Sequence, residues 1–353
     1  MCMDNHIQVK LISLEDIYKT KCFDLKQIIQ IIEDALLAYS NNEIILPDKI
    51  SQIFNEELQT RINCMPSTLL KEGVCGVKWV SVFPNNPKLY NKQNVSGVIL
   101  LSEITTGFPF AIVDGTLITA LRTACLGAIG AKYLARKDSS VYGTIGTGEQ
   151  AKTHFLVMKT LFPNIKTCYV SSRSNESELR FVDAMKTKFD DVEFITCNGD
   201  NDLAARNADI IVTAVSCQAP LLKADSIKPG AFYCHVGGWE DEYDVALKAD
   251  KIVCDDWSSL KHRGSPTIAR MYEKGLLKDS DIYANLPDII SGKKVGRETE
   301  SEFNYFNSIG LSFVDVVVAN YFYKEVTSKG LGTDWSLQEL DAFDVLKDLD
   351  FNK

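Results

Sequence analysis

Two glycines and an alanine stand at fixed spacing in the stretch GTGEQA, residues 146–151. The apolar run VYGTI before it predicts a strand, and the residues after it predict a helix over 149–162. In this pattern the first glycine permits a tight turn, the second lets backbone N–H groups approach a pyrophosphate, and the small alanine lets the helix pack against the strand. The helix N-terminus then presents free N–H groups to the phosphates. We therefore expect a dinucleotide to bind here, through Gly146, Thr147, Gly148, Glu149 and Gln150.

The end of the next predicted strand bears on which dinucleotide binds. Sites for NAD place a carboxylate there for the ribose 2′-hydroxyl, but residues 169–177 read YVSSRSNES, with no Asp or Glu before Glu176. Hydroxyl groups and the guanidinium of Arg173 suit a 2′-phosphate instead. The sequence thus favours NADP over NAD, with Ser172 and Arg173 as contacts, although a polar turn facing solvent has the same composition. Thr213, in the later run DIIVTAV, is a further candidate contact.

Two cations stand inside apolar segments, Lys78 in CGVKWVSV and Arg122 in LITALRTACLG. A charge buried in such a segment is costly unless an anion pairs with it. One interpretation is a structural salt bridge, with Asp114 or Glu103 as the partner. The other is that these cations bind an anionic ligand.

The elements around these residues indicate an α/β protein with two domains. From residue 125 to 315 strand-like runs alternate with predicted helices, which indicates a Rossmann-type, doubly wound parallel sheet. Residues 1–124 predict a second, α+β domain. Its strand-like runs are 76–83, 96–103 and 109–116, and predicted helices cover 25–42 and 117–135. We expect the C-terminal part, 316–353, to return to this first domain with the helix predicted over 312–329.

The composition narrows the function classes. The 353 residues are 45% hydrophobic, enough for two domains with cores, and carry a net charge of −9. Such an acidic chain disfavours nucleic acid and anionic membrane surfaces as partners. None of the ten cysteines forms a CxxC pair and the four histidines lack metal-ligand spacing, so neither a metal site nor a disulfide framework is predicted. The N-terminus is charged where a signal peptide is apolar, and no run approaches the ~18 apolar residues of a membrane span. We expect a cytoplasmic protein.

Several segments, taken in order, resemble the ornithine cyclodeaminase/mu-crystallin family. They are GVKWVSVFPNNP, SGVILLSEITTGFPFAIVDGTLITALRTACLGAIGAKYLA, GTIGTGEQAKTH and GLLKDSDIYANLPDIISGKKVGRE. The resemblance implies a homodimer with a Rossmann domain and a domain for substrate binding and dimerisation. It also implies that a nicotinamide cofactor oxidises or reduces the Cα–N bond of an amino acid. By the same resemblance Arg122 of the R-T-A motif binds the substrate carboxylate, Lys78 lies near the reacting carbon, and Lys49 in LPDKIS is a further basic residue for the substrate.

One position departs from the family pattern. Cyclodeaminases of this family carry an aspartate directly after the paired glycines that end a Rossmann strand, whereas here Trp239 follows Gly237 and Gly238. Acids come one and two places later, so Glu240 and Asp241 are the candidate catalytic acids. Alternatively, they charge a helix N-terminus, where acids are favoured. The shifted register is similar to the family branch that oxidises N-(2-amino-2-carboxyethyl)-glutamate.

Three functions follow from the resemblance. The first is an ornithine cyclodeaminase-like lyase, which converts L-ornithine to L-proline and ammonia and keeps its cofactor bound. The second is a net oxidoreductase that reduces a ketimine such as pyrroline-2-carboxylate or oxidises an N-substituted amino acid. The third, a non-catalytic NADPH-dependent binder of a small ligand, is disfavoured by the presence of Lys78 and Arg122.

Overall fold

The computed structural model of the chain describes residues 6–216, 218–347 and 349. The chain forms two compact units, and neither is continuous in sequence. The first unit comprises Met1–Phe23, Asn42–Thr119 and Ser312–Lys353, and the second comprises Asp24–Asn41 and Ala120–Leu311. The division therefore differs from the expected ranges 1–124 and 125–315, chiefly because residues 24–41 join the second unit.

The first unit is built on a mixed sheet of eight strands. They are β1 Ile7–Ile12, β2 Ile44–Ile45, β3 Ile50–Asn55, β4 Thr60–Leu69, β5 Val74–Val82, β6 Val95–Glu103, β7 Pro109–Asp114 and β18 Thr333–Gln338. Their order is β18-β1-β7-β6-β5-β4-β2, and β3 pairs with β4. Only the β1–β7 pair is parallel among the strand pairs described for this unit. The helices are α1 Leu14–Thr20, α3 Asn86–Leu89, α12 Ser312–Ser328 and α13 Ala342–Lys347.

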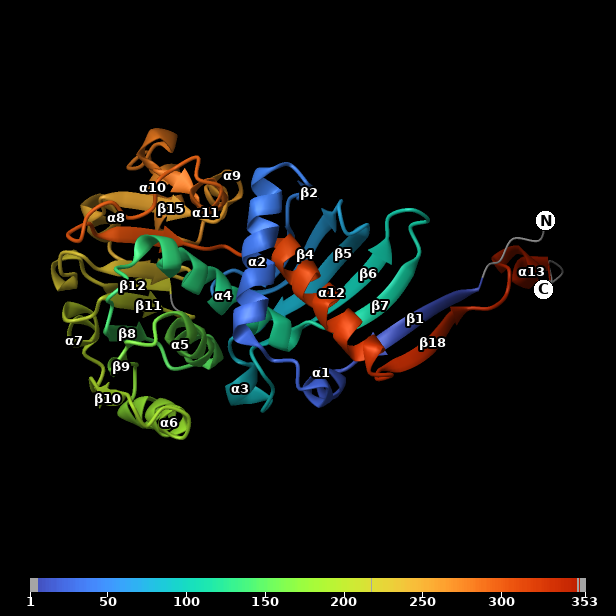
Figure 1. Cartoon of the computed structure of the whole chain (residues 1–353), viewed down its shortest axis with the longest axis horizontal. Helices are drawn as coiled ribbons and strands as arrows, with labels where there is room; N and C mark the ends of the chain where they lie inside the picture. Colours follow the sequence, from blue (N-terminus) through green and yellow to red (C-terminus); the bar gives the residue numbers. More distant parts are fainter. Residues whose placement is uncertain (1–5, 217, 348, 350–353) are drawn as a thin grey trace. The chain divides into compact units, whose positions relative to one another are not determined.

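Helix α12 covers one face of this sheet (Figure 1). Along β5, Gly76, Lys78 and Val80 are buried, and the residues between them are more exposed. This alternation is typical of a strand with one face against a core. A Cβ at Gly76 would lie 2.7 Å from Cγ2 of Val316, so the glycine lets α12 approach β5 closely.

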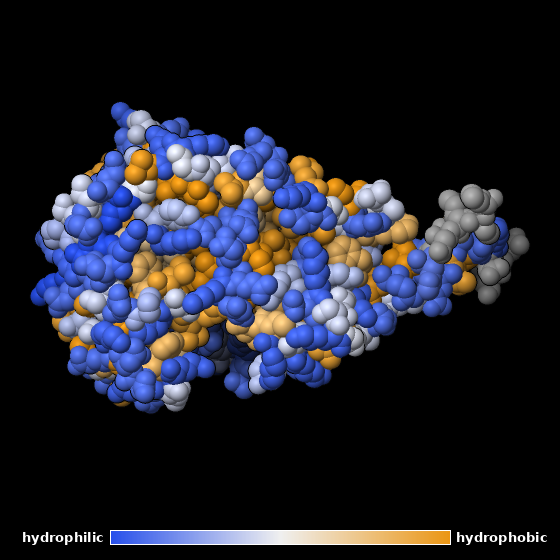
Figure 2. All heavy atoms as spheres, in the orientation of Figure 1, coloured by the Kyte–Doolittle hydropathy of each residue, from blue (hydrophilic) through white to orange (hydrophobic). Residues whose placement is uncertain are grey.

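The opposite face of the same sheet carries a row of apolar residues. Strand pairing places Ile50 opposite Cys64, Cys64 opposite Trp79, and Trp79 opposite Val98. Ile50, Trp79 and Val98 are 62%, 44% and 47% exposed. On the side of the molecule seen in Figure 2, by contrast, hydrophilic residues are spread widely between smaller hydrophobic areas. We call residues 50, 64, 79 and 98 the apolar row.

The second unit confirms the predicted Rossmann-type sheet. Its eight strands are all parallel, in the order β10-β9-β8-β11-β13-β17-β15-β16. They are β8 Val141–Ile145, β9 Thr167–Ser171, β10 Glu193–Thr196, β11 Ile210–Thr213, β13 Phe232–His235, β15 Lys251–Cys254, β16 Ala284–Asn285 and β17 Asn304–Asn307. The chain begins this sheet at β8 and winds outward on both sides, as a doubly wound fold does. A separate parallel pair joins β12 Gln218–Leu222 to β14 Trp239–Asp241.

Helices lie on both faces of this parallel sheet. They are α2 Leu25–Ser40, α4 Thr116–Leu134, α5 Glu149–Leu161, α6 Asn175–Lys186, α7 Asn201–Arg206, α8 Tyr243–Lys248, α9 Trp257–Leu260, α10 Thr267–Glu273 and α11 Leu286–Ile290. Successive residues of β8 point to opposite faces. The ring of Tyr142 packs on Phe155 of α5, with centroids 5.3 Å apart, and a Cβ at Gly143 would lie 2.1 Å from the carbonyl oxygen of Ala204 in α7.

Helix α2 belongs to the second unit because its partners lie there. Asp24 caps its N-terminus by accepting from two backbone N–H groups. On its inner face Glu33, 6% exposed, accepts a hydrogen bond from Nζ of Lys132 at 2.7 Å and another from the hydroxyl of Tyr133. The sequence shows that this helix is amphipathic but not which surface its apolar face meets, so the sequence placed it with residues 1–124, whereas its contacts place it in the second unit.

Helix α4 is long and apolar enough to cross a membrane by length and composition. However, 72% of the qualifying window is buried inside the structure. The same composition is expected of a core helix that packs on all sides. Small residues make this packing possible: a Cβ at Gly130 would lie 2.8 Å from the ring of Phe306.

Candidate active site

The glycine turn opens helix α5, as its spacing predicts. Gly146 has a φ of +113°, and a Cβ there would lie 2.5 Å from the carbonyl oxygen of Ala214. Both the backbone conformation and the lack of room therefore require glycine at this position. Gly148 is the N-cap of α5, and a Cβ there would meet no protein atom within 4 Å. The protein's own packing thus gives no reason for glycine at 148, whereas close approach of a pyrophosphate does.

A second observation at this turn fits a dinucleotide. Helix α5 has 13 residues and its N-cap makes no side-chain hydrogen bond, so its first turn retains donors for an anion. Oε1 of Gln150 is buried and has no hydrogen-bond partner among the residues that the structure describes. Glu149 points away, since its side chain is 83% exposed and pairs with Lys152. The candidate contacts are therefore the backbone of residues 146–149 and the side chain of Gln150.

The polar segment after β9 is shaped by a carboxylate that the sequence analysis did not single out. Glu178 is fully buried, and its Oε1 accepts hydrogen bonds from the N–H groups of Ser172 (2.9 Å) and Gly199 (2.9 Å). Its Oε2 accepts from the N–H of Asn198 at 2.8 Å. This acid is thus occupied by backbone donors, while Arg173 is exposed. Its position in α6, beyond the end of β9, gave no sequence signal of this role.

Arg122 lies in α4 and is 7% exposed. Its guanidinium packs against Gly310, because a Cβ at Gly310 would lie 2.2 Å from Nη1. His154 of α5 is close enough for the Arg122 charge to act on it. Burial, together with this charge, lowers the pKa of His154 to about 4. Nδ1 of His154 lies 2.8 Å from the carbonyl oxygen of Gln150, so a neutral imidazole stands between α4 and the glycine turn.

Lys78 pairs with an acid that the sequence analysis did not propose. Its Nζ lies 2.7 Å from Oδ1 of Asp315 in α12, and both side chains are fully buried. Asp114 and Glu103, the expected partners, are engaged elsewhere. Asp114 accepts from the N–H groups at the start of α4, and Glu103 accepts from the hydroxyl of Thr106. Asp315 was missed because it lies near the other end of the chain.

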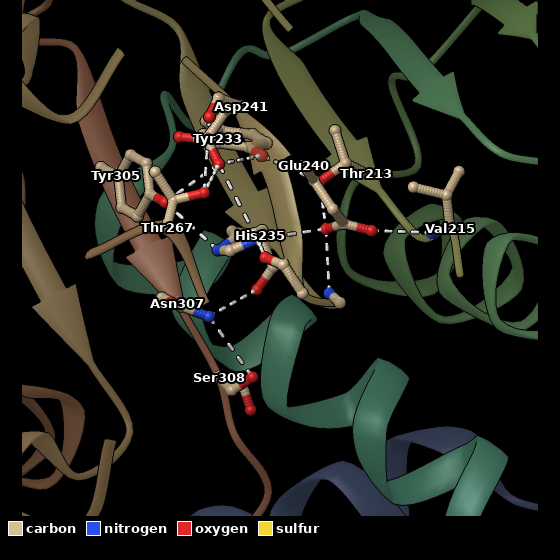
Figure 3. A network of polar contacts seen from close by, with 12 residues as sticks. Thr213, Val215, Tyr233, His235, Glu240, Asp241, Thr267, Tyr305, Asn307 and Ser308 are labelled. Carbon is tan, nitrogen blue, oxygen red and sulfur yellow. Dashed lines mark hydrogen bonds and ion pairs between the residues drawn. The ribbon is translucent and has the colours of Figure 1, made fainter. Parts of the chain in front are cut away.

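Glu240 ties together the ends of two strands (Figure 3). It is fully buried and accepts hydrogen bonds from Oγ1 of Thr213 (2.7 Å), the N–H of Val215 (2.7 Å) and the N–H of Gly237 (2.9 Å). Nε2 of His235 lies 3.3 Å from Oε2 of Glu240. Thr213, expected to contact the cofactor, therefore uses its hydroxyl inside this network.

Asp241 occupies the other side of the same network (Figure 3). It is fully buried and accepts a hydrogen bond from Oγ1 of Thr267 at 2.6 Å. The hydroxyl groups of Tyr233 and Tyr305 each lie 3.4 Å from Oδ1. Burial raises the pKa of Asp241 to about 6. Neither Glu240 nor Asp241 charges a helix N-terminus, because α8 begins at Tyr243 with Glu242 as its N-cap.

The predicted site residues thus form separate groups. Lys78 and Asp315 lie in the first unit, and Lys49 lies there too, partly exposed in the link between β2 and β3. The second unit contains the glycine turn, Arg122 and the buried pair of acids.

Comparison with known families identifies the chain. Residues 10–330 match the model of the ornithine cyclodeaminase/mu-crystallin family. The chain belongs to the ornithine cyclodeaminase/mu-crystallin family. This assignment agrees with the resemblance carried by the R-T-A and GTGEQA motifs.

Individual members of the family are similar over almost the whole chain. The chain is 29% identical to N-((2S)-2-amino-2-carboxyethyl)-L-glutamate dehydrogenase of Staphylococcus aureus, over 87% of this chain and 92% of that protein. It is 30% identical to Thermococcus litoralis Δ1-pyrroline-2-carboxylate reductase, solved in complex with NADH and L-proline. The TM-score is 0.86, and the match covers 92% of this chain and 99% of that one. An archaeal alanine dehydrogenase dimer with bound NAD is 29% identical, with a TM-score of 0.85 and coverage of 94% and 100%.

These three relatives are dehydrogenases and a reductase. The protein, as a member of the ornithine cyclodeaminase/mu-crystallin family, is an enzyme. Two of the solved relatives bind NAD or NADH. The glycine turn of this chain fits such a group, since Gly148 leaves room and α5 presents its N-terminus there. A nicotinamide dinucleotide held at this turn would supply hydride chemistry.

Proposed function

We propose that the protein is a nicotinamide-dependent oxidoreductase that acts on the Cα–N bond of a small amino or imino acid. We further propose a net redox reaction rather than cyclodeamination of L-ornithine. The first substrate class is a ketimine such as Δ1-pyrroline-2-carboxylate, and the second is an N-substituted amino acid such as N-(2-amino-2-carboxyethyl)-L-glutamate. The names of the relatives cover both classes.

The hydrogen bonds of Glu240 are the observation that favours a net redox reaction over cyclodeamination. Cyclodeamination needs an acid beside the substrate to move protons during ring closure and loss of ammonia. The position directly after the paired glycines holds Trp239, and Glu240 accepts three hydrogen bonds from Thr213, Val215 and Gly237. Asp241 is equally buried. A carboxylate that already accepts three hydrogen bonds inside the protein is not available for proton transfer to a substrate. Net hydride transfer does not need a carboxylic acid beside the substrate.

Arg122 and Lys78 take the substrate roles in this proposal. Arginine binds a planar carboxylate with two parallel hydrogen bonds, which orients Cα. A nicotinamide dinucleotide held at the turn of Gly146 and Gly148 would supply or take up the hydride at Cα. In the reductive direction Lys78 delivers the proton that the substrate nitrogen needs, and in the oxidative direction it accepts that proton. The carboxylate of Asp315 lies 2.7 Å from Nζ of Lys78, and this ion pair fixes the position of the amine.

The segment after β9 supports NADP as the cofactor. Glu178 is fully buried and already accepts hydrogen bonds from three backbone donors, so it is not presented to a ribose hydroxyl. Arg173 is exposed beside the hydroxyl of Ser172, whose Oγ donates to the carbonyl oxygen of Ser174 at 2.9 Å. A guanidinium at this place suits a 2′-phosphate. We therefore propose that NADP(H) is preferred over NAD(H).

The apolar row supports a homodimer. Ile50, Trp79 and Val98 are about half exposed on a sheet face that α12 does not cover. Exposed apolar surface of this kind is typical of interaction sites. A second copy of the same chain is proposed to cover it, as the dimeric alanine dehydrogenase relative suggests.

The proposal is tested by following the nicotinamide absorbance and the product mass together. Full-length protein is mixed with Δ1-pyrroline-2-carboxylate and NADPH or NADH, or with N-(2-amino-2-carboxyethyl)-L-glutamate and the oxidised cofactors. We expect one of these pairs to react with one nicotinamide changed per product. L-Ornithine with a trace of oxidised cofactor is the matched control. Formation of proline and ammonia from it, without net change of the nicotinamide, would overturn the proposal in favour of the lyase.

A further inference from the structure

The turn that precedes helix α12 is held by one buried carboxylate. Oδ2 of Asp255, at the end of β15, accepts hydrogen bonds from Oγ of Ser308 (2.9 Å) and from the N–H groups of Ile309 (2.9 Å) and Gly310 (2.8 Å). Its Oδ1 accepts from the N–H of Asp256 at 2.9 Å. Asp255 is fully buried. These bonds fix the backbone of residues 308–310 to the end of β15.

Gly310, the last residue of this turn to bond Asp255, is glycine for two separate reasons. Its φ is +80°, a left-handed conformation that other residues adopt at a cost. A Cβ there would also lie 2.2 Å from Nη1 of Arg122 and 3.0 Å from both Cζ and Nη2. The terminal atoms of the guanidinium therefore occupy the space that a side chain at 310 would take. At Gly292 only the backbone conformation favours glycine, because its φ is +76° and a Cβ there would meet nothing within 4 Å.

We propose that Gly310 is a positioning residue that sets the location of the Arg122 guanidinium, and that Asp255 maintains the turn on which this depends. The inference rests on the proposed function, in which Arg122 binds the substrate carboxylate. Any side chain at 310 pushes the guanidinium away from its place. Because the two N–H groups that grip a carboxylate are rigidly coplanar, a displacement of about 1 Å weakens both bonds and misaligns Cα. Gly310 does not touch the substrate itself.

The test compares Gly310→Ala with Gly292→Ala. Both variants place an alanine at a similar positive φ in the second unit, so both carry a backbone cost of the same kind. We expect Gly310→Ala to raise the KM for Δ1-pyrroline-2-carboxylate about tenfold or more and to leave the dissociation constant for NADPH within about twofold. Gly292→Ala should lower the melting temperature by its backbone cost alone, which is less than in Gly310→Ala, and leave this KM unchanged. Equal KM values in the two variants would overturn the proposal.

A rescue experiment applies whether or not Gly310→Ala is stable. Removing the guanidinium in Arg122→Ala frees the space that the new methyl group needs. We therefore expect the double variant Arg122→Ala/Gly310→Ala to melt close to Arg122→Ala combined with Gly292→Ala. A double variant that melts well below Arg122→Ala/Gly292→Ala would show that the Arg122 contact is not what excludes a side chain, and the proposal would fall.

Asp255→Ala tests the support of the turn without changing Gly310. It removes the oxygen that accepts from the hydroxyl of Ser308 and from the N–H groups of Ile309 and Gly310. We expect the KM for Δ1-pyrroline-2-carboxylate to rise with NADPH affinity kept, and an unchanged KM would overturn the role of Asp255. A wild-type protein that turns over neither Δ1-pyrroline-2-carboxylate nor N-(2-amino-2-carboxyethyl)-L-glutamate overturns the proposed function, but the melting temperatures of the rescue experiment still decide whether Gly310 positions Arg122.

Discussion

Lys78 and Asp315 form an ion pair that has no exposed surface. Removing two charges from water is expensive, and their mutual attraction offsets that cost only while both partners are present. The cross-strand neighbours of Lys78 are Met65 and Ile99, both apolar and buried. Removal of one partner would therefore leave the desolvation cost of the other without compensation, and the protein would lose stability.

We expect Asp315→Asn to destabilise the protein by about 3–5 kcal/mol, because Lys78 then stays buried without its counter-charge. The measurement is urea unfolding followed by circular dichroism. Asp334→Asn is the control: it breaks the Lys10–Asp334 pair in the same unit, but Asp334 is 75% exposed, so the loss should stay below about 1 kcal/mol. A similar loss in both variants would contradict the argument.

The double variant Lys78→Met/Asp315→Leu separates stability from chemistry. Apolar side chains of similar size often replace a buried ion pair without loss of stability. We expect this variant to recover most of the unfolding free energy lost in Asp315→Asn and to have no measurable turnover. Turnover at the wild-type rate would show that Lys78 is structural only.

Arg173 is the residue on which cofactor preference depends. We expect Arg173→Ala to weaken NADPH binding by about 1–3 kcal/mol and to leave NADH binding nearly unchanged, because only NADPH carries the 2′-phosphate. Titration of both cofactors measures this difference. Arg180→Ala removes another exposed arginine, which pairs with Glu176 on α6, and should affect neither cofactor. A wild-type protein that binds NADH more tightly would contradict the preference.

At the scale of elements, the acids after β13 connect strand ends rather than face a ligand. Glu240 joins the end of β11 to the start of the loop at Gly237, where a Cβ would lie 2.4 Å from its Oε1. Asp241 is surrounded by His235, Glu240 and the hydroxyl groups of Thr267 and two tyrosines. Such a buried network makes the stability of this part of the sheet depend on pH.

Burial raises the pKa of Asp241 from its usual 3.8 to about 6. A carboxyl group whose pKa is higher in the folded state contributes stability that is full below about pH 4 and is lost as the pH rises through about 6. Asparagine mimics the protonated form. Relative to wild type, Asp241→Asn should therefore gain roughly 2–3 kcal/mol of unfolding free energy between about pH 4 and about pH 7. Urea unfolding at both pH values measures this change.

Asp191→Asn is the matched control for pH. Hydrogen bonds from Lys166 and Lys159 lower the pKa of Asp191 to about 2, so it is ionised over the whole range. The stability it contributes is lost only as the pH falls towards about 2, and its difference from wild type should stay constant. An Asp241→Asn difference that is equally constant would show that Asp241 is ionised in the folded protein at about pH 4.

The elements that local patterns define were predictable, and those that depend on distant partners were not. The strand before Gly146 and the helix after it follow from hydrophobic runs and turn chemistry, and both are confirmed as β8 and α5. The position of α2, the Lys78–Asp315 pair and the contact of Gly310 with Arg122 are set by tertiary packing. The sequence around such a glycine does not show which distant side chain the glycine makes room for.

At the scale of the whole molecule, the apolar row predicts assembly. Trp79 lies in the middle of this row, between Cys64 and Val98. We expect Trp79→Glu to convert a dimer into monomers at micromolar concentration, because it places a charge in the centre of an apolar contact. Light scattering after size-exclusion chromatography measures the mass. Leu247→Glu, at a 61% exposed leucine of α8, should leave the mass unchanged. A Trp79→Glu protein that remains dimeric would place the interface elsewhere.

The pairing of β1 with β18 places the first described strand beside the last one. Ile7 lies opposite Gln338 and Leu11 opposite Thr333, although the family match ends at residue 330. From β1 to β18 the polypeptide is therefore almost a closed ring, which a short linker from β18 to β1, in place of the residues after β18, would complete. In such a ring the termini can be moved to another exposed turn by circular permutation. An opening at the exposed turn 104–107, between β6 and β7, would leave every described strand of the first unit whole.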